Sequence, residues 1–343
     1  KSQLEGDLFV DNVQRVLYST DASQYKELPL AVTRPKNKED IIKIIRFAHG
    51  NGTSVIPRGA GTSLAGQVVG SGIVVDVSKH MNKIVELNVD EKYVVVEPGV
   101  VLAELNQLLA KYNLQFGPET STANRCVIGG MLGNNSCGLH SLVYGSVRDH
   151  ILEVEAILAN GSETTFKALS KTEFQQKLNG NPNKLEKAIY KNLNEILSDP
   201  ENQKEIREKF PEPKLTRRNM GYAIDALLNS EIFSKGKERF NFCKLLAGSE
   251  GTLAFSHRIK LNLIPLPPRH KGLLCAHFKT LEEALRGNLI ALKHEPTAIE
   301  LMDDTVMQAS KKNIEQRKNR FFVKGDPGAM LMIEFSFETE EGL

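Results

Sequence analysis

Residues 57–67 read PRGAGTSLAGQ, and this is the most informative stretch of the chain. It lies between a short β-rich run, TSVIP, and the apolar run IVVDVS, and its glycines are Gly59, Gly61 and Gly66. Glycine adopts positive φ and lets a ligand approach the main chain, and successive N–H groups in such a turn bind anions. The stretch therefore favours a bound diphosphate, although a plain mobile loop explains this one segment equally well.

The spacing of these glycines excludes two common nucleotide-binding loops. A Rossmann fingerprint has G-x-G-x-x-G at the start of a helix and an acidic residue about 20 positions later. Here the glycines are spaced differently and a strand follows them. A Walker loop requires G-K-[ST], which the sequence lacks.

Two further glycine-rich segments occur later in the chain. Residues 117–145 read GPETSTANRCVIGGMLGNNSCGLHSLVYG, and residues 248–254 read GSEGTLA. A loop of about 29 residues with little regular structure is uncommon in a compact domain and usually functional. Small residues let the chain wrap closely around a large planar ligand, and Asn and Ser side chains add hydrogen bonds. We therefore expect three walls around one extended ligand.

Helical and strand patterns alternate around these segments. The run EDIIKIIRFAHG predicts a helix, and IVVDVS, KYVVVEPGV and HILEVEAILANG predict strands, which together indicate a layered α/β or α+β domain. Residues 170–240 are charged and helical with few bulky apolar residues, which predicts a surface insertion. The prolines of PLPPR at 265–269 mark a linker. We expect one domain over 1–265 and the beginning of a second over 266–343.

In the second domain, GLLCAHFKTLEEALRGNLIALKH predicts a strand followed by a helix. The apolar stretch AMLMIEFSF predicts another strand, in a sheet that the chain leaves unfinished.

The composition excludes several classes of protein. Of 343 residues, 41% are hydrophobic, and the net charge is only +2, so neither disorder nor a nucleic-acid partner is indicated. No apolar run is long enough to span a membrane, and the first residues lack a signal-peptide pattern. The four cysteines form no CxxC and the histidines no HExxH, so we expect no metal site, free thiols and a cytoplasmic protein.

The three glycine-rich segments, in this order, resemble the FAD-binding domain of the vanillyl-alcohol oxidase and p-cresol methylhydroxylase superfamily. The sequences of these segments most resemble the GlcD-like branch of the superfamily, which includes glycolate oxidase subunits and D-lactate and D-2-hydroxyglutarate dehydrogenases. RPKNKEDIIKIIRFA, PRGAGTSLAG, GGMLGNNSCGLHSLVYGSVRDHI and GSEGTLA carry the likeness. It covers residues 28–265 well and 266–343 only through ELMD at 300–303.

The resemblance implies an α+β fold of the p-cresol methylhydroxylase type, with two subdomains that hold FAD between them and the start of an α+β cap domain after them. It implies cofactor contacts in all three segments. The first supplies Pro57, Arg58, Gly59, Ala60, Gly61, Thr62, Ser63 and Gln67. The second supplies Pro118, Ser121, Gly129, Gly130, Asn134, Asn135, Ser136, Gly138, Tyr144 and Gly145, and the third supplies Glu250 and Gly251.

Some members of the superfamily attach the flavin covalently through a histidine in the first loop. The corresponding stretch here is GAGTS, without histidine, so we expect non-covalent FAD. Cys126 lies near a position where some relatives carry a flavin-linked cysteine, but its register matches poorly.

The residues that would perform catalysis are not identified by the sequence. Members of the branch carry a metal-binding and basic segment resembling HGDGN, which this chain lacks. His140, His257 and His277 have no motif that supports a role as base, and we expect each to be a structural or surface histidine. In RRNMGYAIDAL, Arg218 is a weak candidate for binding a substrate carboxylate and Tyr222 for facing the flavin. A basic helix start with a packed tyrosine explains that segment equally well.

The leading hypothesis is an FAD-linked dehydrogenase of a 2-hydroxy acid such as D-lactate, glycolate or D-2-hydroxyglutarate. Its electrons would pass to a quinone or an iron–sulfur domain. The alternatives are another oxidoreductase on the same fold, such as a UDP-N-acetylenolpyruvoylglucosamine reductase or a sugar-lactone oxidase, and an FAD-binding module without activity of its own.

Overall fold

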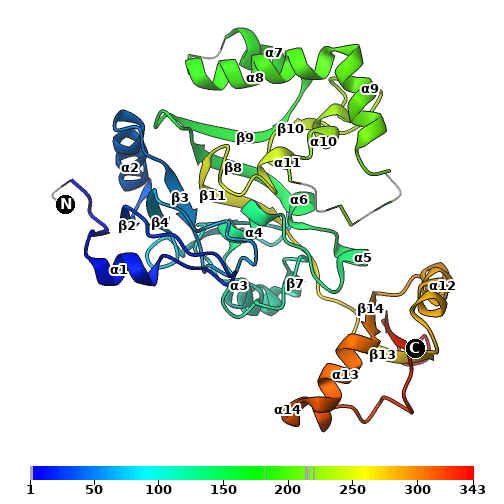
Figure 1. The fold of residues 1–343 in the computed structure, drawn as a ribbon. Coiled ribbons are helices and arrows are strands. Elements are labelled where there is room, and N and C mark those ends of the chain that lie inside the picture. The colour runs from blue at the N-terminus through cyan, green and yellow to red at the C-terminus, as the bar shows by residue number, and fades with distance from the viewer. Residues whose placement is uncertain (1–2, 181, 213–214, 216, 219–220) are drawn as a thin grey trace. The chain divides into compact units, whose positions relative to one another are not determined.

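The structure is a computed structural model that describes residues 3–180, 182–212, 215, 217–218 and 221–343. Contacts within the chain define two compact units, Lys1–Ser136 with Ser146–Ile264 and Cys137–Gly145 with Pro265–Leu343. Both units combine helices with mainly antiparallel sheets, so the fold is α+β (Figure 1). The division into domains 1–265 and 266–343 stays a prediction. In these contacts, Cys137–Gly145 clusters with the second unit.

The first unit begins with a small mixed sheet of strand order β1-β2-β4-β3. Its strands are β1 (Asp7–Phe9), β2 (Ala31–Arg34), β3 (Val55–Arg58) and β4 (Ile73–Asp76). β2 and β3 run parallel to β4, which is buried along its whole length, as is usual for a parallel strand with both faces covered. Because β3 ends at Arg58, it leads directly into the first glycine-rich segment.

Helix α2 (Lys38–Gly50) packs on this small sheet, whereas α1 (Asn12–Leu17) buries none of its residues. The Asn37 side chain caps α2 by accepting the N–H of Asp40, and Ile41, Ile44 and Ile45 form the buried face. The helix predicted from EDIIKIIRFAHG is therefore confirmed.

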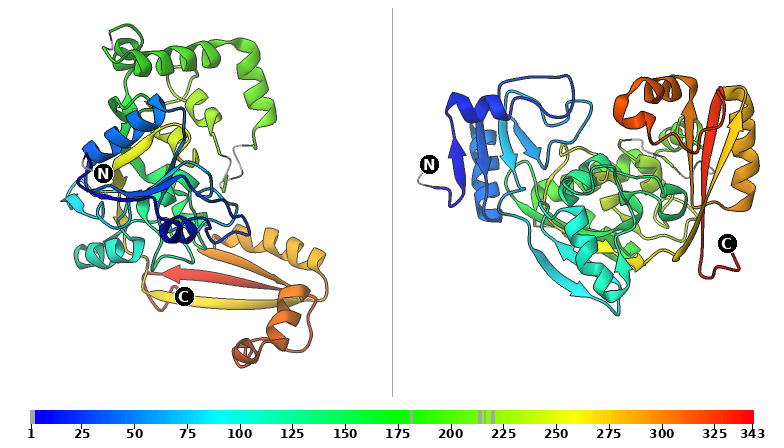
Figure 2. Two further views of the ribbon diagram at one scale, coloured as in Figure 1. Left: turned by 60° about the vertical axis from the view of Figure 1, so that its left-hand side comes forward. Right: turned by 90° about the horizontal axis from the view of Figure 1, so that it is seen from below.

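The larger sheet of the first unit is antiparallel, with the strand order β10-β9-β8-β11-β6-β5. Its strands are β5 (Ile84–Asn88), β6 (Tyr93–Val96), β8 (Ile151–Ile157), β9 (Glu163–Leu169), β10 (Phe240–Asn241) and β11 (Phe255–Asn262). Around it lie α3 (Leu102–Leu109), η1 (Ala110–Tyr112) and the ribbon of β7 (Leu114–Gln115) with β12 (Ile264–Pro265). Figure 2 shows the ribbon from two further directions.

The segment 117–145 is more regular than its composition suggests. It contains α4 (Ile128–Asn134) and α5 (Ser141–Tyr144), and α6 (Val147–His150) follows, so the expectation of little regular structure is wrong. Ile128, Met131 and Leu132 lie on one face of α4 and are buried. Packing of this apolar face stabilises the helix despite its glycines, because tertiary contacts outweigh helix propensity.

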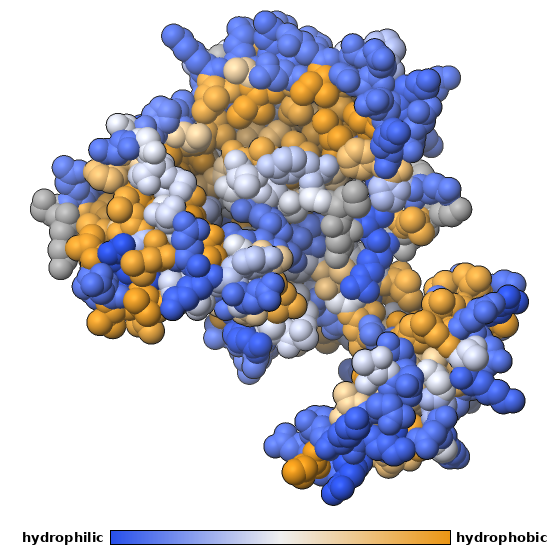
Figure 3. All heavy atoms as spheres, in the orientation of Figure 1, coloured by the Kyte–Doolittle hydropathy of each residue, from blue (hydrophilic) through white to orange (hydrophobic). Residues whose placement is uncertain are grey.

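The charged region after β9 forms helices, as predicted, but it also contributes to the core. Its helices are α7 (Lys171–Asn179), α8 (Lys184–Ser198), α9 (Pro200–Lys209), α10 (Ile224–Leu228) and α11 (Cys243–Leu246). Phe174, Tyr190 and Phe240 are fully buried against one another, so the expectation of few bulky core residues is wrong. Most charged side chains of these helices cover the outer surface, which is blue in Figure 3, although Glu186 of α8 and Asp225 of α10 are buried.

The second unit is built on the antiparallel sheet β13-β15-β14, with strands β13 (His270–Phe278), β14 (Ala298–Asp303) and β15 (Ala329–Phe337). Helix α12 (Leu281–Ala291) buries Ala284 and Ala291 against one face. The unit also contains η2 (Leu292–His294), α13 (Asp304–Lys312) and α14 (Ile314–Arg317). The predicted strand-then-helix order and the strand AMLMIEFSF are both confirmed. Among the described residues, no helix combines the length and apolar character required to cross a bilayer.

Candidate cofactor site

A cavity of about 100 Å³ in the first unit is lined by all three glycine-rich segments. The first segment contributes Pro57, Arg58, Gly59, Ser63 and Gln67. The second contributes Gly129, Gly130, Leu132, Gly133 and Asn134. The third contributes Ser249, Glu250 and Gly251. Segments separated by more than a hundred positions therefore meet around one space.

Main-chain hydrogen bonds join the second and third segments. The N–H of Gly248 donates to the carbonyl of Leu132 at 3.0 Å, and the N–H of Glu250 donates to the carbonyl of Gly133 at 2.9 Å. Glu250 has φ 51°, which side-chain-bearing residues rarely adopt. This conformation holds the third turn against the end of α4.

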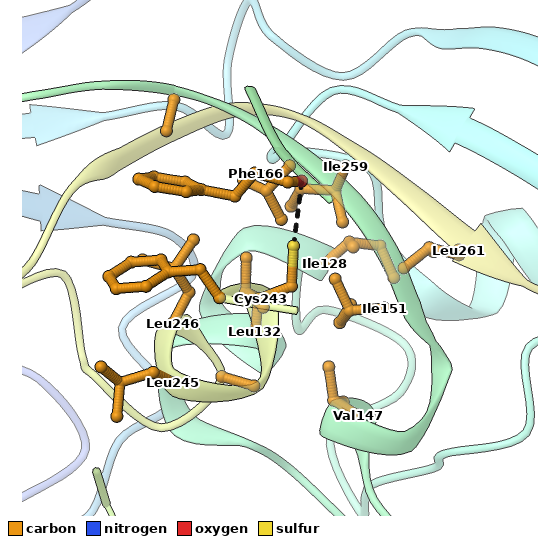
Figure 4. Close-up of a cluster of buried hydrophobic side chains, with 14 of the residues drawn as sticks. Ile128, Leu132, Val147, Ile151, Phe166, Cys243, Leu245, Leu246, Ile259 and Leu261 are labelled. Atoms are coloured by element: carbon orange, nitrogen blue, oxygen red, sulfur yellow. Dashed lines mark hydrogen bonds between the residues drawn. The ribbon is translucent and has the colours of Figure 1, made fainter. Parts of the chain in front are cut away.

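The inner face of α4 anchors the second segment in the core. Figure 4 shows Ile128 and Leu132 packed with Ile151, Ile259 and Cys243, whose thiol donates to the carbonyl of Phe166 at 3.1 Å. Since the apolar side of α4 is fixed in this way, its glycines are left to face the cavity.

The glycines of the cavity wall allow close approach of the chain. A Cβ at Gly59 would lie 2.4 Å from Cγ2 of Val127, and one at Gly129 would lie 2.6 Å from Cβ of Pro98. Gly130 differs, because its Cβ would meet only Val127, at 3.8 Å. A side chain at residue 130 would thus enter the cavity rather than the core.

Arg58 supports the first loop from the N-terminal segment. Its Nη2 donates to the carbonyl of Thr20 at 2.9 Å, and its guanidinium lies 5.0 Å from the ring centre of Tyr18. The Tyr18 hydroxyl donates to Asp76 at 2.6 Å. Burial lowers the pKa of Arg58, but an arginine remains charged at neutral pH. The cation therefore ties loop 59–63 to residues 18–20.

The other residues predicted to contact FAD do not line the cavity, and they lie in the first loop, around α4 and in the second unit. Ala60, Gly61 and Thr62 belong to the first loop, and Pro118 and Ser121 to the turn before α4, but the cavity lining does not include them. Asn135 caps α4 with φ 54°, and the Ser136 hydroxyl donates to the Asn134 side chain at 3.0 Å. Gly138, Tyr144 and Gly145 belong to the second unit.

Several lining residues were missed by sequence reasoning. They are Val68, Val77, Pro98, Leu132, Gly133, Leu246, Ser249, Ala254, Phe255 and Ser256. Leu132, Gly133, Ser249 and Ala254 lie inside segments already recognised, and the Pro98–Gly99 turn was a usable signal. A Cβ at Gly99 would lie 2.4 Å from the carbonyl of Val77, so only glycine fits there. The other apolar lining residues, Val68, Val77, Leu246 and Phe255, carry no local signal.

The weak catalytic candidates have partners within the protein. Arg218 forms an ion pair with the buried Asp225, and the Tyr222 hydroxyl lies 2.5 Å from Oγ1 of Thr252. Neither residue lines the cavity. Their roles toward substrate and flavin stay predictions.

The three histidines also have partners. His140 lies 2.8 Å from Glu334, His257 is buried 3.8 Å from Glu155, and His277 contacts the carbonyl of Cys275 at 3.0 Å. Within the described part of the chain, no three His, Cys, Asp or Glu side chains gather in an arrangement that could hold a metal ion.

The cavity fits one part of an anionic dinucleotide. Its volume is below the roughly 300–1,000 Å³ of typical ligand pockets, so a portion such as the diphosphate would be enclosed. The glycine loop and the Ser63 hydroxyl offer donors to that portion. Asn135, the neighbour of the lining residue Asn134, is 1% exposed and its Nδ2 has no hydrogen-bond partner among the described residues, but Asn135 itself does not line the cavity.

The family described as FAD binding domain matches residues 29–167. The chain is 34% identical to a D-2-hydroxyglutarate dehydrogenase of Haemophilus influenzae over 90% of this chain and 30% of the relative. It is 35% identical to one of Escherichia coli, over 90% of this chain and 30% of the relative. Glycolate oxidase subunit GlcD of Bacillus subtilis is 26% identical over 86% of this chain and 50% of its own length. The chain thus spans under a third of the D-2-hydroxyglutarate dehydrogenases.

A solved structure of alkyldihydroxyacetonephosphate synthase has the same fold. It superposes with a TM-score of 0.62 at 17% identity, over 96% of this chain and 53% of the synthase. The sequence match and the convergence of the three glycine segments agree. Residues 29–167 are an FAD-binding domain of the p-cresol methylhydroxylase type, FAD is its cofactor, and the chain resembles the GlcD-like branch of that superfamily.

Proposed function

We propose that this chain is the FAD-binding part of a dehydrogenase that oxidises a 2-hydroxy acid to the 2-oxo acid. The similarity to several D-2-hydroxyglutarate dehydrogenases, at 32–35% identity over at least 90% of the chain, carries the proposal. D-2-hydroxyglutarate is accordingly the first substrate to test, before D-lactate and glycolate. The cavity lined by the three glycine segments supports the proposal independently, because its backbone donors are suited to the diphosphate of a dinucleotide.

Bound FAD would supply the two-electron acceptor for the C–H bond of the alcohol carbon. The chain's own residues bind and orient that acceptor. The first loop, from Pro57 to Ser63, and the α4 glycines would hold the diphosphate by main-chain donors. The third turn, at Glu250 and Gly251, would close the cavity. Non-covalent attachment follows from the absence of histidine in GAGTS.

The hydroxyl proton of the substrate requires a base whose pKa is near the working pH. Of the described residues that line the cavity, Arg58 and Glu250 are ionisable, and both are engaged, with Thr20 and Gln67 respectively. We therefore place the base outside this cavity. Arg218 remains the proposed ligand of the substrate carboxylate, which would replace Asp225 as the partner of the guanidinium. A quinone or an iron–sulfur domain is the proposed electron acceptor.

We also propose a cytoplasmic location. Cys126, Cys243 and Cys275 are free thiols, as a reducing compartment favours.

Anaerobic spectroscopy of the purified chain tests the function. The FAD-loaded protein should show the oxidised flavin spectrum, which D-2-hydroxyglutarate should bleach while the L-enantiomer does not. Bleaching by D-lactate or glycolate alone would change the substrate but keep the reaction class. A flavin spectrum that no 2-hydroxy acid bleaches would fit a binding module, and it would fit equally well an activity that requires the HGDGN-like segment that this sequence lacks. Absence of FAD binding would overturn the site.

A further inference from the structure

Arg148 of α6 contacts two stretches of chain, residues 244–247, which lead into the third glycine turn, and the carbonyls of Arg218 and Gly221. It is 8% exposed and does not line the cavity. Its Nε donates to the carbonyl of Lys244 at 2.8 Å, and its Nη2 donates to the carbonyls of Ala247 at 2.6 Å and Gly221 at 2.9 Å. One guanidinium thus joins α11, the start of the third turn and the segment before Tyr222.

The main chain of Arg148 extends this connection to the second segment. Its N–H donates to Oδ1 of Asn135 at 2.8 Å. Asn135 ends α4, and its neighbour Asn134 lines the cavity. The side chain and backbone of one buried residue therefore contact Ala247 and Asn135, which adjoin the lining residues Leu246 and Asn134 of two cavity walls.

The third turn approaches the guanidinium so closely that residue 248 has no space for a side chain. A Cβ at Gly248, which has φ +94°, would lie 2.7 Å from the carbonyl oxygen of Gly221 and 2.8 Å from Nη2 of Arg148. Tyr222 follows Gly221, and its hydroxyl contacts Thr252 on the far side of the third turn. The turn is consequently held from both sides, by Arg148 at its start and by Tyr222 at its end.

We propose that Arg148 is a positioning residue that fixes the third glycine turn against α4, so that the cavity is preformed for FAD. This inference rests on the proposal that the cavity holds FAD. A planar guanidinium presents several donors in a fixed arrangement, which a lysine ammonium does not reproduce. The charge alone is therefore insufficient, and Arg148→Lys should fail to hold the turn.

The experiment compares apoprotein of the full 343-residue chain with Arg148→Lys and with Leu197→Ala, which removes a fully buried side chain of α8 away from the cavity. FAD affinity is measured by quenching of flavin fluorescence, and Tm by calorimetry of each apoprotein. We expect Arg148→Lys to raise the FAD Kd at least tenfold, or about 1.4 kcal/mol. Leu197→Ala should lower Tm at least as much but leave the Kd within twofold of the wild type.

A Kd within twofold of the wild type for Arg148→Lys would overturn the inference, and so would an equal rise in Kd for Leu197→Ala. Hydrogen exchange of the apoproteins gives a second measurement that does not need FAD. Arg148→Lys should selectively expose amides 248–252, whereas a uniform loss of protection that includes β8 and β11 would also overturn the inference. If wild-type apoprotein does not bind FAD, the proposed site is wrong, and the exchange result still decides whether Arg148 holds the turn.

Discussion

The side-chain amide of Gln67 donates a hydrogen bond of 3.2 Å to the carboxylate of Glu250, which lies 183 positions later in the chain. Both residues line the cavity, so this bond connects its first and third walls directly. Gln67 also orders its own turn, because its Oε1 accepts the N–H of Ala65. The two contacts make Gln67 a brace between glycine-rich loops that have few side chains of their own.

Gln67→Ala should weaken FAD binding without unfolding the protein. The bond has a charged acceptor but is exposed to water, so we expect a rise in FAD Kd of about three- to tenfold. Fluorescence titration of the apoprotein measures it, with the exposed helix residue Gln175→Ala as the matched control. Equal affinities for the two variants would show that the brace does not contribute to the cofactor site.

Gly130→Leu should block the cofactor site and leave the fold intact. Its Cβ would meet only Val127 at 3.8 Å, so the new side chain would occupy the cavity rather than the core. The control is Gly50→Leu at the end of α2, where a Cβ meets nothing within 4 Å. We expect flavin to be lost from Gly130→Leu only, with apoprotein Tm values near that of the wild type, measured by absorbance and calorimetry. Normal FAD content in Gly130→Leu would exclude this cavity as the site.

The convergence of the three glycine segments was predictable. Glycine is the residue that permits positive φ and close approach of a ligand to the main chain, and its positions can be read directly from the sequence. The amphipathic helix α2 was also predictable, because its isoleucines recur at helical spacing. Helix α4 was missed because Gly129 and Gly130 have low helix propensity. Only the core that receives Ile128 and Leu132 stabilises it, and that core is not visible from local sequence.

The apolar cavity residues were missed for a related reason. Val68 and Phe255 face the cavity because of where their strands and turns lie in three dimensions, and neither belongs to a motif. In the helical insertion, the abundance of charged residues concealed the fully buried Phe174 and Tyr190, which lie on inner faces. Sequence reasoning thus located the loops that approach a ligand better than it located the packing behind them.

FAD should be released completely when the holoprotein is precipitated with acid, because the first loop, GAGTS, has no histidine and Cys126 is buried. Cys126 is 5% exposed, packs in the main core and contacts Thr120 at 3.2 Å. Absorbance of the supernatant and pellet measures the release, and Cys126→Ser should release the same fraction. Yellow colour retained in the wild-type pellet and lost in Cys126→Ser would demonstrate a cysteinyl link instead.

His257 should make the first unit less stable as the pH falls through about 6.5. Burial lowers the pKa of this histidine, although Glu155 partly opposes the effect. The folded state therefore holds His257 neutral, and its stabilisation is complete above the unfolded pKa of about 6.5 and is lost progressively below it. His257→Gln should reduce the fall in unfolding free energy between pH 7 and 5, measured by urea titration. The exposed His49→Gln is the control and should keep the wild-type slope.

Glu334 should give the second unit a separate, more acidic transition. Burial by itself would raise the pKa of Glu334, but the hydrogen bond from His140 and the charges of His140 and Lys271 outweigh it and hold the pKa below its ordinary value. Stability from this carboxylate is therefore present above about pH 4.5 and is lost as the pH falls through the lowered folded pKa.

The His140–Glu334 contact attaches segment 137–145 to strand β15, so hydrogen exchange of that segment reports on the transition. We expect wild-type protection of 137–145 to decline below about pH 4.5. Glu334→Gln should show weaker protection at pH 7 and a smaller further decline, because the amide cannot titrate. Glu338→Gln, an exposed residue just beyond β15, should follow the wild type. A decline of equal size in Glu334→Gln would mean that another group controls this attachment.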